Sequence, residues 1–131
     1  MREIELSNDS GRVSLSWSFD GDYYVAVKVR AHGFRGHADG HVADTEFRSF
    51  AQAMQDLAIA RQGEATLASV LPGLFELSVR SIDRIGHLGV FGSLSFVSAE
   101  NPEERQSLSF SLHFDPSEVE RAAAALREIA A

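Results

Sequence analysis

Hydrophobic and polar residues alternate strictly in several segments of this chain. In residues 12–19, serines separate Leu15, Trp17 and Phe19, and residues 23–32 continue the alternation after an Asp-Gly sequence. Successive side chains of a β-strand point to opposite faces, so each segment has one apolar face and one polar face. Because Asp-Gly favours a tight turn, the two segments together predict a β-hairpin.

The same alternation predicts strands at residues 74–82, 88–97 and 107–115, and a short one at 64–70. Many of their polar positions are serines, so we expect the solvent-facing side of the sheet to be rich in hydroxyl groups. Residues 33–42 are rich in glycine and fit either a bulged strand or a second Asp-Gly turn.

Two segments repeat their apolar residues at helical spacing, at about 45–61 and 116–130. The first is expected to have Asp44 or Thr45 as its capping residue and to end at Gly63. Each helix has a single apolar stripe, which must face a sheet.

The second helix has a strong start signal in Asp115-Pro116-Ser117-Glu118, with a capping residue, a proline and a glutamate in their preferred positions. Clean alternation is typical of antiparallel strands with one covered face and one open face. The predicted fold is therefore a single α+β domain over residues 1–131. It has two layers: a mainly antiparallel sheet of about six strands, with the two helices on one face.

Composition and charge narrow the function classes. Of the 131 residues, 44% are hydrophobic and 24% are charged, as in an ordinary globular domain and unlike a disordered chain. The absence of cysteine excludes disulfides, cysteine-based zinc sites and thiol nucleophiles. A formal net charge of -7 disfavours nucleic acid and anionic membranes and favours a cationic partner. The charged N-terminal segment does not resemble a secretory signal, so we expect a cytoplasmic protein.

The usual catalytic motifs for phosphate, dinucleotide or metalloprotease chemistry are not found. His37, Asp39 and His41 resemble a metal-binding set. On a strand, however, residues four apart lie roughly 13 Å from each other, too far for both imidazoles to reach one ion with bonds of about 2.0 Å. We therefore expect no catalytic residue, no metal, no cofactor and no enzymatic activity.

Exposed acids and one tyrosine are the candidate contact residues. Tyr23 and Tyr24 must face opposite ways, so one of them would be exposed and suited to anchor an interface. Acidic side chains in turns and loops would attract a cationic protein. The candidate partner-binding residues are Asp20, Asp22, Asp39, Glu100, Glu103 and Glu104.

The order of elements is similar to that of the WapI-type family of small bacterial immunity proteins and of neighbouring families with the same plan. The similarity covers nearly the whole chain: a hairpin bearing Trp17, the segments Leu74-Phe75-Glu76-Leu77 and Gly86-His87-Leu88-Gly89-Val90, and a last strand that runs into a capped helix. The resemblance implies a protein that binds and blocks a cognate toxin domain, often a cationic nuclease, inside the producing cell. It supplies no motif for contact residues.

Two alternatives are left open by the residues themselves. The hydroxyl-rich face or the segment 33–40 would suit a small-molecule-binding domain. The open face would also suit a self-assembling structural domain that buries it in a homodimer, since open sheets invite pairing.

Overall fold

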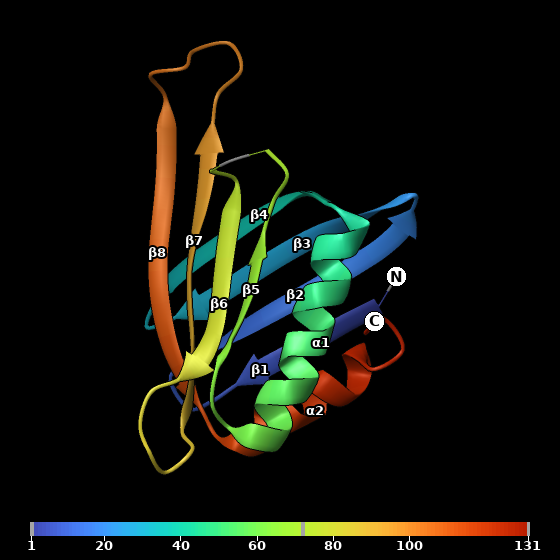
Figure 1. The fold of residues 1–131 in the computed structure, drawn as a ribbon. Helices are drawn as coiled ribbons and strands as arrows, with labels where there is room; N and C mark the ends of the chain where they lie inside the picture. The colour runs from blue at the N-terminus through green and yellow to red at the C-terminus, as the bar shows by residue number, and fades with distance from the viewer. Residues whose placement is uncertain (1, 72, 131) are drawn as a thin grey trace.

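The structure is a computed structural model that describes residues 2–71 and 73–130. In this part of the chain eight strands form two separate four-stranded antiparallel sheets, each followed by a helix (Figure 1). The first half of the chain contains, in order, β1 (Arg2–Ser7), β2 (Gly11–Asp20), β3 (Asp22–Ala31), β4 (Phe34–Val42) and α1 (Asp44–Ala60). The second half contains β5 (Glu64–Ala68), β6 (Phe75–Ser81), β7 (Leu88–Val97), β8 (Arg105–Phe114) and α2 (Pro116–Leu126).

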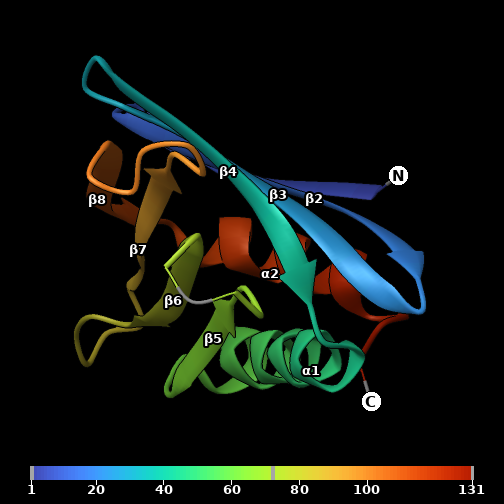
Figure 2. The same ribbon diagram turned by 90° about the horizontal axis from the view of Figure 1, so that it is seen from above.

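The two halves thus repeat one arrangement, a four-stranded meander followed by a helix, although no internal repeat is evident in the sequence. The strands of the first sheet, β1–β4, cross those of the second sheet, β5–β8, and the helices lie where the two sheets diverge (Figures 1 and 2). Helix α1 packs beside β5 and against α2, while α2 packs against β1. Each helix therefore lies beside the first strand of the other half.

The α+β class and the antiparallel pairing are confirmed, but the prediction of one sheet with about six strands is wrong. Helix α1 separates β4 from β5 in the sequence, and these two strands do not pair. Strand β1 was missed, although Ile4 and Leu6 alternate there with Glu3 and Glu5 and both apolar side chains are buried. The helices do not cover one sheet by themselves, because the second sheet covers part of the first (Figure 2).

In the described residues one cluster of buried apolar side chains joins both sheets and both helices. Leu15 and Trp17 face this core as the alternation predicts, each no more than 4% exposed. Phe19, predicted on the same face, is instead 57% exposed. Phe19 lies near the tip of the β2–β3 hairpin, which extends beyond the helices (Figure 1). Its ring packs on Tyr23 (centroids 4.9 Å), whereas Tyr23 itself is buried against Phe47.

Strand β4 approaches the second sheet through a glycine. A Cβ atom on Gly36 would lie 2.9 Å from the side chain of Leu94 and 2.7 Å from that of Leu108. Since glycine has no side chain, the backbone of β4 can lie close to β7 and β8 at this point. The glycine-rich segment pairs with β3 without interruption, so neither a bulge nor a second turn forms there.

The start of α1 differs from the prediction. Its N-cap is Ala43, whose side chain makes no capping hydrogen bond, and Asp44 is already part of the helix. Asp44 and Glu46 still place negative charge at the positive end of the helix dipole. The last helical residue is Ala60, close to the predicted end at about 61. Arg61 follows as the C-cap in a left-handed conformation (φ 55°), so the helix stops before the predicted Gly63.

The start of α2 is as predicted, with Asp115 as N-cap and proline at the first position. The helix is shorter than expected and ends at Leu126. No helix within the described residues is long and apolar enough to cross a membrane.

We expect Asp115→Ala to destabilise the protein at neutral pH and to have little effect in strong acid. The backbone amide of Ser117 donates a hydrogen bond to the Asp115 carboxylate (3.0 Å), which lowers the pKa of Asp115. A lowered folded-state pKa contributes stability above the pKa of the unfolded chain, and this is lost as the pH falls through the folded-state pKa. Urea unfolding over a pH series measures the difference between the two proteins.

Asp115→Asn is the matched control, because asparagine also caps helices but does not titrate. It should retain most of the stability at neutral pH. A loss for the alanine variant that is equal at every pH would contradict the role of the charged carboxylate.

Candidate functional site

The outer face of the second sheet is rich in hydroxyl groups, as the sequence predicts. Strand pairing places Ser93 opposite Ser109 and Ser95 opposite Ser107, and Thr66 opposite Ser78. The serines of β2 lie on the outer face of the other sheet, so the hydroxyl-bearing residues are divided between two faces.

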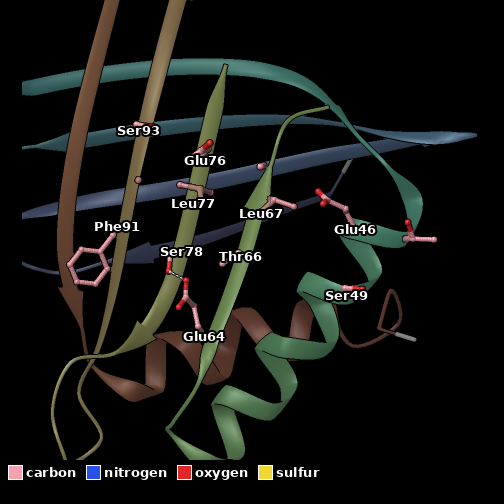
Figure 3. Close-up of a pocket in the computed structure, with 13 residues that line it drawn as sticks. Glu46, Ser49, Glu64, Thr66, Leu67, Glu76, Leu77, Ser78, Phe91 and Ser93 are labelled. Carbon is pink, nitrogen blue, oxygen red and sulfur yellow. Dashed lines mark hydrogen bonds between the residues drawn. The ribbon is translucent and has the colours of Figure 1, made fainter. Parts of the chain in front are cut away.

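An open groove of about 630 Å³ crosses this outer face beside the edge strand β5 (Figure 3). The first turns of α1 form one side of it, and β5, β6 and β7 form its floor. Three carboxylates line the groove: Glu46 from α1, Glu64 from β5 and Glu76 from β6. Phe91 of β7 lies on the side of the groove away from α1, with Ser78 and Ser93 nearby (Figure 3).

The charge of this groove is negative. Among the described residues that line it, none is lysine, arginine or histidine. Glu64 accepts a hydrogen bond from the Ser78 hydroxyl (2.9 Å), which orients one carboxylate. The nearby Arg80 stacks its guanidinium over the Phe91 ring at 4.0 Å from the centroid. The carboxylates of the groove can thus accept hydrogen bonds from a cationic group, while one face of the Phe91 ring is already covered by Arg80.

All six candidate acids predicted from the sequence are exposed, but the structure does not bring them together. Asp20 and Asp22 flank the β2–β3 turn, and Asp39 lies on the outer face of β4. The remaining three lie in the β7–β8 connection, on the opposite side of the molecule from the β2–β3 turn in Figure 2. These three are Glu100, Glu103 and Glu104.

Tyr24 is the exposed member of the tyrosine pair, with 41% of its surface accessible, while Tyr23 is only 6% exposed. A hydrogen bond to the Asp39 carboxylate, together with slight desolvation and the negative charge of Asp39, raises the pKa of Tyr24. Its ring meets His41 edge-on, with centroids 5.2 Å apart. This small cluster is a second exposed feature, on the first sheet and away from the acidic groove.

The histidines of β4 are arranged as expected for a strand. His37, Asp39 and His41 all lie on its exposed side, at every second residue. Within residues 2–71 and 73–130, no group of three or more histidine, aspartate or glutamate side chains is placed to hold a metal ion.

The three groove glutamates were missed as a set by sequence reasoning. None of the three is among the acids predicted from the sequence as candidate partner-binding residues. Each lies on a different element, and only the packing of α1 beside β5 brings them to one groove. Alternation did show that Glu76 faces away from the core, but nothing in the pattern connects it with Glu46.

The described residues thus form a two-sheet α+β protein whose groove beside β5 is acidic. Residues 4–131 match the Immunity protein WapI-like family, so the chain belongs to this family. Comparison with curated proteins and with solved structures gave no match. Family membership confirms the resemblance, and it indicates an immunity function and a cognate toxin as partner; such a family is generally non-enzymatic.

Proposed function

We propose that this protein neutralises a toxin by binding a cationic region of it in the groove formed by α1 and β5–β7. The observation that carries the proposal is the set of three carboxylates, Glu46, Glu64 and Glu76, in one open groove of a chain that belongs to an immunity protein family. A lysine or arginine of the toxin would form charge-assisted hydrogen bonds there. We expect the complex to form in the cytoplasm of the producing cell.

The acidic residues of the β7–β8 connection would favour such a complex by speeding its association. Exposed charges at the rim of an interface mainly speed association, while charges inside it slow dissociation. We therefore propose that Glu100, Glu103 and Glu104 steer a cationic toxin toward the protein, with the groove glutamates in direct contact.

The test is co-expression with the toxin domain encoded by the neighbouring gene, followed by co-purification, a growth assay and binding kinetics. Two triple variants remove the same charge: Glu46→Gln/Glu64→Gln/Glu76→Gln in the groove and Glu100→Gln/Glu103→Gln/Glu104→Gln in the loop. We expect the groove variant to weaken affinity at least about tenfold through faster dissociation. The loop variant should reduce only the association rate and its dependence on salt.

A neighbouring toxin that neither co-purifies nor is neutralised would contradict the function. If the loop variant instead accelerates dissociation while the groove variant binds normally, the toxin contacts the loop and the proposed site is wrong. Thermal unfolding of both variants verifies that they are folded.

A further inference from the structure

The outer face of the first sheet carries a concentration of positive charge in a chain whose net charge is -7. It lies where β2 begins, β3 ends and β4 begins, at the left-hand ends of β3 and β4 in Figure 1. We name as the basic patch the exposed side chains Arg12, Lys28, Arg30, Arg35 and His37.

The strand register aligns these side chains. Arg30 of β3 pairs with Arg12 on one side and with Arg35 on the other, so three guanidinium groups occupy one cross-strand row. In the next row Lys28 lies opposite His37. Like charges directly opposite each other destabilise a sheet. Within the described residues only Arg12 of this set has a carboxylate partner, Glu5 at 3.3 Å.

The basic patch contains a groove and has acidic residues on both sides. A groove of about 500 Å³ runs between Arg12, Lys28, Arg30 and Arg35. Acidic residues limit the patch on both sides: Glu5 lies on β1, and Asp39 follows His37 on the outer face of β4. An anion placed in the groove would relieve the repulsion in the arginine row, since arginine binds carboxylates through paired hydrogen bonds.

We propose that the basic patch binds an acidic segment of a partner protein. Glutamates at positions i and i+4 of a helix lie about 5–6 Å apart, close to the spacing of about 4.8 Å between neighbouring strands. A helix of this kind would therefore present carboxylates in register with Arg12, Arg30 and Arg35. A nucleic acid strand fits less well, because its charged backbone would continue over Glu5 or Asp39.

This surface differs from the groove assigned to the toxin. The basic patch is on the outer face of the first sheet, and the acidic groove is on the outer face of the second. Figure 2 shows the two sheets as separate layers. The two sites have opposite charge and share no lining residue. The inference therefore does not depend on the proposed immunity function, and either can fail alone.

The test uses the purified full chain and a labelled helical peptide of about 16 residues with glutamates at i, i+4 spacing. Fluorescence anisotropy measures its affinity, and NMR follows the arginine side-chain signals. We expect binding that weakens with added salt, and at least about fivefold weaker binding for Arg30→Gln/Arg35→Gln. The control, Arg84→Gln/Arg127→Gln, removes the same charge at two exposed positions elsewhere and should bind normally.

Four outcomes would overturn the inference. The acidic peptide does not bind, or its glutamine analogue binds equally well. Both double variants lose affinity to the same extent, which would indicate a general effect of net charge. A single-stranded RNA of similar length binds the patch more tightly than the peptide, which would assign the site to nucleic acid.

Discussion

Replacing Phe47 with alanine is expected to lower the free energy of unfolding by about 3–5 kcal/mol, the usual range for a buried phenylalanine. The Phe47 side chain is completely buried. Its ring stacks on Tyr23 with centroids 4.5 Å apart and lies 5.5 Å from Trp17, so α1 is joined to β2 and β3 through this one residue. Its removal leaves a cavity that neighbouring rings cannot fill without moving the helix. Urea unfolding, followed by tryptophan fluorescence and by circular dichroism, measures the loss.

Ile59→Ala is the matched control on the same helix. Ile59 is 85% exposed, so its truncation removes little packing and should change stability by no more than about 0.5 kcal/mol. Alanine favours the helix at both positions, so equal losses for the two variants would show that the burial of Phe47 does not determine the effect. A small loss for Phe47→Ala would mean that α1 does not pack against the first sheet as described.

The second large effect is expected for Gly92→Val in β7, with a loss of about 1–3 kcal/mol or more from overpacking. A Cβ atom at this position would lie 2.7 Å from the backbone carbonyl oxygen of Glu76 and 2.8 Å from the ring of Phe110. The ring can move, but the carbonyl belongs to the paired strand β6 and can move only if the pairing shifts. Thermal or urea unfolding of the purified variant gives the loss.

Ser95→Val is the control for Gly92→Val, because Ser95 lies on the outer face of the same strand. Valine is favoured in strands, so this change should leave stability unchanged or raise it slightly. If Gly92→Val were as stable as the native protein, the close approach of β6 and β7 at this point would be wrong.

The two sheets differ in the charge of their outer faces, and the net charge of the chain does not show this difference. The value of -7 alone predicts attraction of cations everywhere. The structure separates an acidic groove with Glu46, Glu64 and Glu76 from a row of arginines on the other sheet. We therefore expect each face to attract partners of opposite charge through its local field, with binding at either face weakened by salt.

The sequence by itself determined which face of most strands and helices is apolar, because alternation and helical spacing depend only on local backbone geometry. It did not determine how far that face is covered, since Phe19 lies on an apolar face and is 57% exposed. It placed Leu15 and Trp17 in the core, predicted Asp115 as a helix cap, and predicted a serine-rich outer surface; the structure confirms all three. The resemblance to an immunity protein family, carried by the order of elements, is also confirmed.

Only the tertiary structure decided how the strands are grouped and which polar residues meet. Alternation shows which face of a strand is apolar, but it does not determine which strand pairs with which. Two sheets formed in place of one, because β5 packs beside α1 and does not pair with β4. That same packing brings Glu46 to Glu64 and Glu76, residues up to thirty positions apart, and register aligns Arg12, Arg30 and Arg35. Such neighbours arise from long-range contacts, which leave no periodic signal along the chain.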